Sequence, residues 1–581
     1  MQPIAYRLRI DRPHTHRLSV ELRVPPQPGP LEMAIPAWTP GAYKVVDHAR
    51  NVRRVAAHDP AGQPLRVERR DLHTWAVHGT ERGVTVTYEV FADKLMIHQA
   101  QLNADHAFLN GGPVWLCVKA CRHWPATVQV DVPPGWRVAT ALPPAQGGTW
   151  TARDYDELVD SPIEAGPFGL TTVGAAGVEW EVVWHDTLGS QPEGSPDLLA
   201  KVADGVARLG KAAADLMGPP PFSRYVCFFH ESTEPGYLNG LEHQGSLVMQ
   251  GPLEAGTRPE PFFTMVAHEI MHAWNGRRLA PQGLGRGCDL WRPAHTTALW
   301  LVEGGTEYYA EVLALRAGVV DVTTFLGGLA DMISQYERTP GRLVTSLEEA
   351  SFITWQFGDD RWNGAINYYL KGALVTWALD AELRDRTGGK RSMDDVLRAL
   401  WERFGDHTEY LPEAIEDVAA EIAGGSLDEF FDRMLRSVEP IDWSVPAGKL
   451  GLDLRARDLA ALGLRATGPA GGLKVEHVDA FGPAEEAGIQ TGDILVTVGG
   501  KKATERALAL AKASGRPGDA LALQALRGER LLGFDLVLGG DRTYDLVPAE
   551  RPSEKQQAIL AAFLGTAAAR PLAVAGGGDR G

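Results

Sequence analysis

The chain has 581 residues, which is too long for one hydrophobic core, so about three or four domains are expected. Hydrophobic residues make up 44% of the sequence and charged residues 23%, proportions that are ordinary for a soluble globular protein. The formal net charge of -17 disfavours nucleic acid and anionic membranes as partners, because both need a basic surface.

The sequence predicts no disulfide framework and no membrane span. Its four cysteines, Cys117, Cys121, Cys227 and Cys288, are too few for such a framework and are expected as small buried residues. The N-terminus lacks the apolar stretch of a signal peptide, and no run of about 18 apolar residues occurs. We therefore expect a cytoplasmic protein. A secreted or periplasmic location stays open if a leader preceded Met1.

Residues 1–166 predict an N-terminal all-β domain, sandwich-like in architecture. Apolar and polar residues alternate with the period of a strand, for example in residues 17–24 and 83–90, and Pro and Gly clusters separate these runs. The segment 160–167, which contains two prolines, is interpreted as the exit from this domain.

Residues 167–442 predict a mostly helical domain behind a small leading sheet. The segment 178–184 has the pattern of a strand. Apolar residues then recur at helical spacing in four segments, which are 198–216, 304–316, 364–384 and 393–403. The proline- and glycine-containing run 446–451 is interpreted as a linker.

Residues 447–546 resemble a PDZ domain. A strand over 472–478, a short helix over 482–489 and a strand with a tight turn over 492–500 carry the sequence pattern of such domains. PDZ domains bind extended peptides by adding a strand to a sheet edge, so we expect either a peptide ligand or a structural module whose groove is unused. The tail, 547–581, is expected to form a short helix and then to be disordered.

Two histidines four positions apart carry the clearest chemical signal in the sequence. His268 and His272 would lie on one face of a helix, so both imidazoles could reach one metal ion. Glu269 lies between them, where it could take a proton from a water that the metal activates. Pro259 suits the start of this helix and Gly276 its end. The pattern predicts a zinc peptidase.

Catalytic zinc takes three protein ligands, so a third must come from elsewhere in the chain. Glu303, in the run Trp-Leu-Val-Glu-Gly that opens a helix, resembles the third-ligand segment of gluzincin aminopeptidases. His295 is the rival third ligand. Glu307, one turn further on, is either a partner of a ligand histidine or a solvated residue of the helix surface.

Four separate segments together resemble the glycyl aminopeptidase family of gluzincin zinc metallopeptidases. In chain order they are 36–43, 268–281 with the pattern HExxHxWNxxRLxP, 299–309 with EGxTxYY, and 368–373, followed by the PDZ-like domain. The resemblance implies a multidomain α+β protein with an N-terminal β domain, a thermolysin-like α-rich peptidase domain and a C-terminal PDZ domain. It also implies one zinc ion per chain, bound by His268, His272 and Glu303.

The same resemblance implies roles for further residues. Tyr369, in Tyr-x-Lys-Gly, would stabilise the tetrahedral intermediate with its phenol; Tyr368 beside it leaves an ambiguity of register. The run 239–243, Asn-Gly-Leu-Glu-His, resembles the exopeptidase motif and brings Gly240 and His243 to the substrate side. Glu242 would bind the substrate's free α-ammonium group, which is how an aminopeptidase measures one residue from the end.

The predicted function is hydrolysis of the N-terminal residue, glycine or alanine by family preference, from peptides with a free N-terminus. Two alternatives stay open. One is a zinc endopeptidase with the same metal site, and the other is a peptide-binding scaffold that acts through its PDZ domain.

Overall fold

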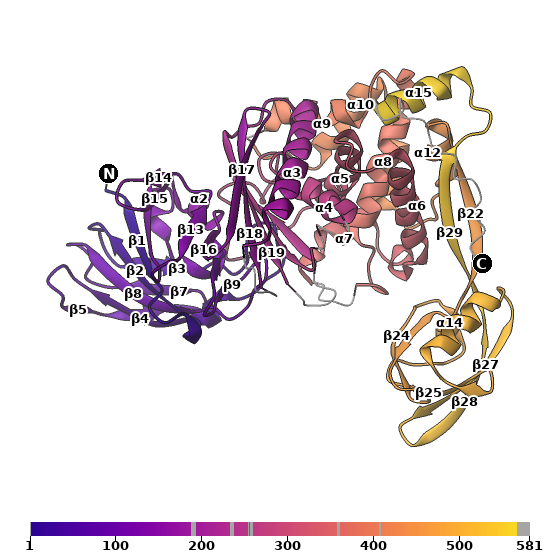
Figure 1. Ribbon diagram of the computed structural model, residues 1–581, viewed down its shortest axis with the longest axis horizontal. Coiled ribbons are helices and arrows are strands. Elements are labelled where there is room, and N and C mark those ends of the chain that lie inside the picture. Colours follow the sequence, from indigo (N-terminus) through magenta and orange to yellow (C-terminus); the bar gives the residue numbers. More distant parts are fainter. Residues whose placement is uncertain are drawn as a thin grey trace. The chain divides into compact units, whose positions relative to one another are not determined.

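The computed structural model describes residues 2–187, 193–232, 238–253, 255, 259–356, 361–405 and 408–565. It divides into two compact units. Figure 1 labels their helices and strands and colours them along the chain. Unit 1 comprises Met1–Thr296, Tyr309–Val320 and Leu397–Ile415. Unit 2 comprises Thr297–Tyr308, Asp321–Val396 and Glu416–Gly581. Each is described by itself below.

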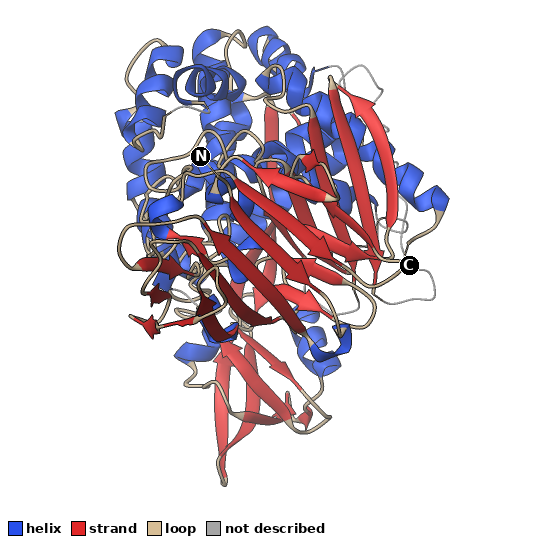
Figure 2. Ribbon diagram, turned by 90° about the vertical axis from the view of Figure 1, so that its left-hand side faces the viewer, coloured by secondary structure: helices blue, strands red, loops and turns tan. Residues whose placement is uncertain are grey.

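Unit 1 opens with a β-rich region, which faces the viewer in Figure 2. Its largest sheet has eight strands in the order β14-β15-β12-β1-β2-β8-β4-β5. These strands are β1 (Ile4–Arg9), β2 (Arg17–Val24), β4 (Val52–His58), β5 (Pro64–Leu65), β8 (Val84–Phe91), β12 (Ala126–Asp131), β14 (Pro144–Ala145) and β15 (Thr149–Ala152). Buried and less buried residues alternate along β2 and β8, as an amphipathic sheet requires.

Two four-stranded sheets complete this region, in the orders β13-β16-β10-β9 and β11-β3-β7-β6. Their strands are β3 (Leu31–Ala34), β6 (Val67–Arg69), β7 (Thr74–Val77), β9 (Ala100–Leu102), β10 (Ala107–Leu109), β11 (Cys117–Val118), β13 (Arg137–Thr140) and β16 (Ile163–Gly166). Two short helices, α1 (Gly111–Val114) and α2 (Tyr155–Val159), interrupt the strands. The region is therefore β-rich, as the alternating pattern predicts.

A five-stranded sheet follows, in the order β17-β18-β19-β21-β20. Its strands are β17 (Gly169–Ala175), β18 (Val178–Asp186), β19 (Arg224–Glu231), β20 (Asn239–Glu242) and β21 (Ser246–Gly251). The helices α3 (Pro196–Met217) and α4 (Pro259–Met271) pack on this sheet and on each other. β20 is an edge strand that pairs only with β21 among the described residues.

Both faces of this sheet are covered. On β19, Val226 and Phe228 pack into an apolar cluster with residues of the β-rich region, such as Phe108. On the opposite face of the same strand, Phe229 meets Phe262 of α4, with ring centroids 5.3 Å apart. A strand buried on both faces needs a continuous apolar run, which is what the middle of β19 has.

Unit 2 is built mainly from helices. They include two π-helices, over Trp300–Gly305 and Asp432–Arg436, and the helices α6 (Val322–Arg338), α7 (Leu347–Phe352), α8 (Tyr368–Thr387), α11 (Asp428–Phe431), α12 (Ser444–Lys449) and α15 (Glu554–Leu564). Three further helices, α5 (Thr306–Arg316), α9 (Met393–Phe404) and α10 (Glu413–Ala423), have residues in both units. α8 is buried almost all round, which suits its position as a central helix.

The C-terminal part of unit 2 has the strand–helix order of a PDZ domain. A six-stranded sheet runs β23-β24-β25-β27-β28, with β26 paired to β25, and a long ladder joins β22 to β29. The strands are β22 (Leu452–Ala461), β23 (Leu464–Thr467), β24 (Leu473–Val478), β25 (Ile494–Val498), β26 (Lys501–Lys502), β27 (Ala520–Arg527), β28 (Arg530–Val537) and β29 (Gly539–Pro548). The helices are α13 (Pro483–Glu486) and α14 (Glu505–Ser514).

The expected exit at 160–167 contains the strand β16, whose four residues are all buried between β13 and β10. Its flanking prolines bound this short strand, which is the last strand of the β-rich region. The structure corrects one interpretation. The expected linker at 446–451 overlaps α12, where Pro446 occupies the first turn, a position that needs no backbone N–H donor. The tail's expected helix corresponds to α15, and its expected disordered end lies outside the described residues.

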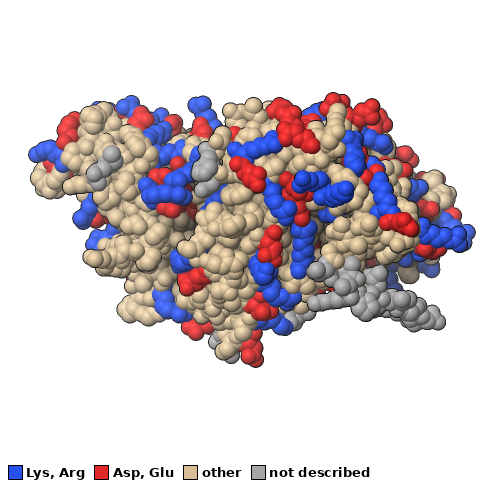
Figure 3. Space-filling view, turned by 90° about the horizontal axis from the view of Figure 1, so that it is seen from above, with Lys and Arg blue, Asp and Glu red and all other residues tan. Residues whose placement is uncertain are grey.

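None of the helices among the described residues is long and apolar enough to cross a membrane. On the face seen in Figure 3, acidic and basic side chains are interspersed rather than gathered into one patch of a single sign. Cys117, Cys121 and Cys227 are buried free thiols, as expected of small core residues, and Cys288 is half-buried.

Candidate active site

The last turn of α4 presents the predicted histidine–glutamate motif. His268 is 8% exposed, Glu269 5% and His272 1%. α4 carries apolar residues on most of its surface, which explains why the whole helix end is buried. His272 continues the helical hydrogen bonding, since its N–H donates to the carbonyl of His268 at 3.2 Å.

The two imidazoles converge in a way that suits a metal ion. Their Nε2 atoms lie 3.0 Å apart, and the ring planes are 76° from parallel. Nδ1 of His272 donates to the carbonyl of Asn275 at 2.8 Å, so its Nε2 carries the lone pair. Because zinc–nitrogen bonds are about 2.0–2.1 Å, two lone pairs at this separation can share one ion.

Glu303 lies on the π-helix that precedes α5 and is 2% exposed. Its neighbour Gly304 allows this helix to approach α8 closely, because a methyl group on Gly304 would lie 2.4 Å from Cα of Gly372. Gly372 belongs to the Tyr-x-Lys-Gly run, so its lack of a side chain is explained by helix packing. π-Helical turns inside helices are frequent at functional sites.

The ligand atoms of His268, His272 and Glu303 lie within 4.8 Å of one another. Two imidazole nitrogens and one carboxylate oxygen are a donor set that zinc accepts, and three protein ligands leave a fourth position for water or substrate. The residues therefore fit a catalytic zinc ion. His295, the rival ligand, is exposed and does not belong to this group, and Glu307 is half-buried in the first turn of α5.

The edge strand β20 lies beside the carboxylate of Glu269. A methyl group on Gly240 would lie 2.0 Å from Oε1 of Glu269, so only glycine leaves room for this carboxylate. Gly240 and Glu242 are two residues apart on a strand and therefore point to the same face. Sequence reasoning named Gly240 from a motif, and the contact with Glu269 gives the physical reason.

Glu242 is buried, with 4% of its surface exposed. Its Oε1 accepts no hydrogen bond from any described residue. Gly41 covers the carboxylate: it has a φ of +90°, and a methyl group on it would lie 2.7 Å from both carboxylate oxygens. Gly41 belongs to the 36–43 segment, which is anchored by Trp38, whose Nε1 donates to the carbonyls of Asp289 and Arg292, each at 3.1 Å. A buried carboxylate oxygen without a donor is costly and is suited to a cationic ligand.

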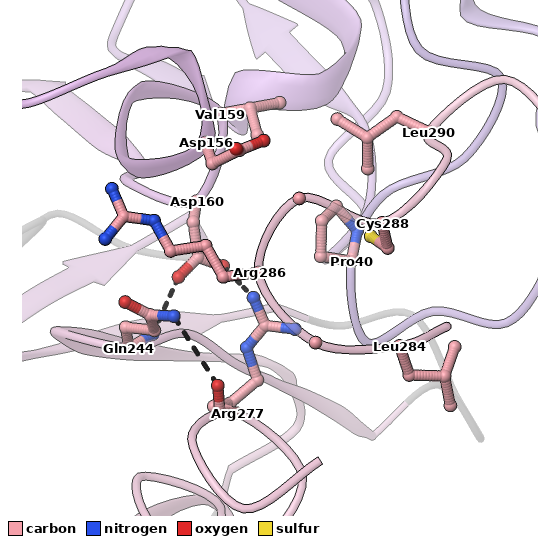
Figure 4. Close-up of a pocket in the computed structure, with 12 residues that line it drawn as sticks. Pro40, Asp156, Val159, Asp160, Gln244, Arg277, Leu284, Arg286, Cys288 and Leu290 are labelled. Atoms are coloured by element: carbon pink, nitrogen blue, oxygen red, sulfur yellow. Dashed lines mark hydrogen bonds and ion pairs between the residues drawn. The ribbon is translucent and has the colours of Figure 1, made fainter. Parts of the chain in front are cut away.

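His243 is fully buried and held by Asp160, which sequence analysis missed. Figure 4 shows Asp160 between Gln244 and Arg277. Its Nδ1 lies 3.1 Å from Oδ1 of Asp160, which also accepts from Nη2 of Arg277 at 2.6 Å. Oδ2 of Asp160 accepts from the backbone N–H of Gln244 at 2.8 Å. Burial alone would raise the pKa of Asp160, but Arg277 and His243 reverse this and lower it. Burial likewise would lower the pKa of Arg277, but Asp160 and Glu242 raise it. Arg277 could have been noticed in the sequence, because it lies in the run that follows the zinc helix. Nothing in the local sequence pointed to Asp160.

The two tyrosines at the start of α8 differ in burial. Tyr368 is 3% exposed, and its hydroxyl accepts from Oγ1 of Thr354 at 3.0 Å. Burial raises the pKa of Tyr368, and the carboxylate of Glu303 adds to this effect against Arg361. Tyr369 is half-buried and stacks on Tyr368, with ring centroids 5.0 Å apart. The hydroxyl of Tyr368 is thus engaged in the interior of unit 2, which favours Tyr369 as the residue that meets substrate.

Family comparisons agree with these segments in chain order. The model for the Peptidase M61 N-terminal domain matches residues 5–167, the model for M61 glycyl aminopeptidase matches residues 261–375, and a PDZ domain model matches residues 448–538. The chain belongs to the M61 glycyl aminopeptidase family. It is a metallo-aminopeptidase with an N-terminal β-rich domain, a central helical peptidase domain and a C-terminal PDZ domain.

Solved structures share this fold. An aminopeptidase N family protein from Idiomarina loihiensis is 24% identical and matches 96% of this chain and 100% of its own, with a TM-score of 0.88. The M1 zinc metallopeptidase from Deinococcus radiodurans is 16% identical and matches 76% of this chain and 95% of its own, with a TM-score of 0.50. Among curated proteins no match was found.

A second buried cluster of this M61 family member holds a proton network rather than a metal ion. The ligand atoms of His106, Glu164 and His185 also lie within 4.8 Å of one another. However, the rings of His106 and His185 are stacked 4.0 Å apart and only 17° from parallel, so their in-plane lone pairs cannot meet at one ion. Glu164 instead accepts from His106 at 2.9 Å and from His230 at 2.8 Å. Burial would raise the pKa of Glu164, but these two histidines lower it to about 2.

Proposed function

We propose that this chain is a zinc aminopeptidase that removes one residue, glycine or alanine, from peptides with a free N-terminus. The observation that carries the proposal is that the ligand atoms of His268, His272 and Glu303 lie within 4.8 Å of one another. The buried carboxylate of Glu269 follows directly on the first of these histidines. The zinc identity and the substrate preference are implied by the family match and its zinc-dependent structural relatives.

When bound, zinc polarises the scissile carbonyl and makes water nucleophilic at neutral pH. Glu269 is the general base that accepts a proton from the attacking water and the general acid that returns it to the leaving amine. Its carboxylate is held between the helix end and β20, where Gly240 leaves it space. A base held in this way loses little entropy as the reaction proceeds.

Tyr369 donates its phenol hydrogen to the oxyanion that develops on the scissile carbonyl oxygen. The backbone N–H of Tyr369 takes no part in this step, because it donates a hydrogen bond to the side chain of Asn367, which caps the helix, at 2.9 Å. This cap fixes the first turn of α8 and so orients the tyrosine.

Glu242 binds the α-ammonium group of the substrate. Arg277 already contributes positive charge near this carboxylate, yet Oε1 of Glu242 accepts no hydrogen bond from a described residue. An ammonium group would fill that place with a charge-assisted hydrogen bond. His243, the next residue, is held at Nδ1 by Asp160, so it orients this end of β20.

The free edge of β20 suits an extended substrate, because an edge strand presents unpaired backbone groups to a peptide. Gly240 would bring its backbone close to that peptide. We propose a PDZ-bound peptide only as a further partner, since the family match supports the domain but names no ligand.

Cleavage of matched peptides, one with a free N-terminus and one N-acetylated, tests the proposal. The parent should release one residue from the free peptide only, and a chelator should stop it. The Glu242→Gln variant should lose at least about a hundredfold in kcat/KM on the free peptide, because a charge-assisted contact in a buried site is lost. Equal cleavage of the acetylated peptide would instead indicate the endopeptidase alternative.

A further inference from the structure

The PDZ domain contacts the segment that leads into α8. Nε1 of Trp362 donates to Oδ1 of Asp479 at 2.7 Å. The amide of Asn363 donates to the carbonyl of Val478 at 2.8 Å and accepts from the N–H of Ala480 at 2.9 Å. Asn363 thus pairs with the backbone on both sides of Asp479, as a neighbouring strand would. A side chain that satisfies one donor and one acceptor defines a specific register for the contact.

Charge and ring contacts add to this register. The guanidinium group of Arg465, on β23, lies over the ring of Trp362, 5.4 Å from its centroid. His477, on β24, meets the edge of the same ring, with centroids 6.5 Å apart. Trp362 is therefore held by side chains from two strands of the PDZ sheet as well as by Asp479.

The segment 361–365 is itself a tight, hydrogen-bonded turn. The N–H groups of Gly364 and Ala365 donate to the carbonyl of Arg361 at 3.1 Å and 2.8 Å. The carbonyl of Trp362 accepts from the N–H of Gly341 at 3.0 Å. A methyl group on Gly341 would lie 2.3 Å from the carbonyl oxygen of Ala365, so the turn packs against backbone with no space to spare. A displacement on one side of such a turn is passed to the other side.

The other side of this turn holds the tyrosines. Nη2 of Arg361 donates to Oγ1 of Thr354 at 3.2 Å, and that hydroxyl donates to the hydroxyl of Tyr368 at 3.0 Å. The guanidinium group of Arg361 lies over the ring of Tyr368, 5.6 Å from its centroid. Tyr368 in turn stacks on Tyr369 at an interplanar angle of 27°. A continuous set of contacts therefore joins the PDZ domain to Tyr369.

We propose that the PDZ domain is a positioning element for Tyr369, acting through the contacts of Trp362 and Asn363. Both are positioning residues, because neither is placed at the reacting atoms. The proposal rests on the proposed function, since it takes Tyr369 as the oxyanion donor. It assigns the PDZ domain a part in the turnover rate that does not depend on capturing a peptide.

The test uses the full-length zinc-loaded enzyme with alanine 4-nitroanilide as substrate. Asn363→Ala removes both backbone contacts, and Trp362→Phe removes the hydrogen bond to Asp479 but keeps an aromatic ring. Each should lower kcat by roughly tenfold or more, because misplacing a catalytic group by a fraction of an ångström slows the chemical step. KM and zinc content should stay within twofold of the parent. The matched control is Arg530→Ala, at an exposed position of β28 on the opposite edge of the same sheet, which should keep the parental kcat.

A double-mutant cycle separates positioning from a general loss of structure. In a Tyr369→Phe background, Asn363→Ala should cause less than a twofold further loss, because its effect passes through the missing hydroxyl. Parental kcat in both Trp362→Phe and Asn363→Ala would overturn the positioning role. So would losses that multiply in the double variant. A Tyr369→Phe enzyme with parental kcat would remove Tyr369 from the proposed mechanism, which is a different failure and is visible in the single variant.

Discussion

Replacing Gly240 by alanine tests whether the edge strand β20 positions the general base. The added methyl group would lie 2.0 Å from Oε1 of Glu269 and 2.5 Å from its Cδ. Ordinary contact begins at 3.4 Å, so the carboxylate would have to move by about 1.4 Å. Since a misplacement of about 1 Å can cost about a hundredfold in rate, and a general base contributes about 10²–10⁴-fold, we expect kcat to fall by at least about a hundredfold.

The assay is steady-state hydrolysis of alanine 4-nitroanilide, with zinc content and melting temperature measured on the same sample. Zinc should stay bound, because the three atoms nearest to the added methyl group all belong to Glu269, which is not one of the proposed zinc ligands. Gly174→Ala is the matched control: Gly174 lies on β17, the opposite edge strand of the same sheet, and a methyl group there meets nothing within 4 Å. A Gly240→Ala enzyme with near-parental kcat would refute the reasoning, and so would equal losses in both variants.

Three further predictions follow from other contacts. Gly41→Ala should raise KM for free-amine substrates about tenfold or more by displacing Glu242. The control is Gly62→Ala, because Gly62 also has a positive φ but a methyl group there would meet nothing within 4 Å, so KM should not change. Equal KM values in the two variants would contradict the prediction. Glu303→Ala should lower zinc occupancy in metal analysis, and full occupancy would remove Glu303 from the ligand set. Burial lowers the pKa of His185 from 6.5 to about 4. The stability that depends on a neutral His185 is therefore complete above pH 6.5 and is lost as the pH falls towards 4. By pH 5 the free energy of unfolding should be lower by about 2 kcal/mol. The parental melting temperature should therefore fall between pH 7 and pH 5, and His185→Phe should show a shallower fall; the same slope in both would contradict the assignment.

Several features of the zinc motif could be predicted because they are local. His268 and His272 lie four residues apart, and helix geometry alone brings such a pair to one face. The PDZ pattern is local in the same sense, since its strands, turns and short helix follow one another along the chain. In the same way, the apolar periodicity predicted α3 and α9 to within two residues of their bounds.

Other features depended on partners far apart in the sequence. The prolines of the segment 160–167 indicate the exit from a domain, but they give no sign that Asp160 meets His243 and Arg277, residues 83 and 117 positions away. Glu164, on the buried strand next to it, is tolerated in the interior because His106 and His230 supply its hydrogen bonds. Neither partner could be inferred from the local pattern.

The sequence by itself indicated the candidate chemistry: a histidine pair for a metal, a glutamate between them for proton transfer, and a PDZ domain further on. Spacing along a helix is sufficient for the histidine pair, because side chains four residues apart share a face whatever the rest of the chain does. Glu303 and Tyr369 were expected only from the resemblance to a known family. The tertiary structure alone decided the surroundings: Gly240 against Glu269, Gly41 against Glu242, and Trp362 and Asn363 against the PDZ sheet. These contacts depend on where distant segments meet, and close packing leaves room at each of the two glycines for a hydrogen atom but not for a methyl group.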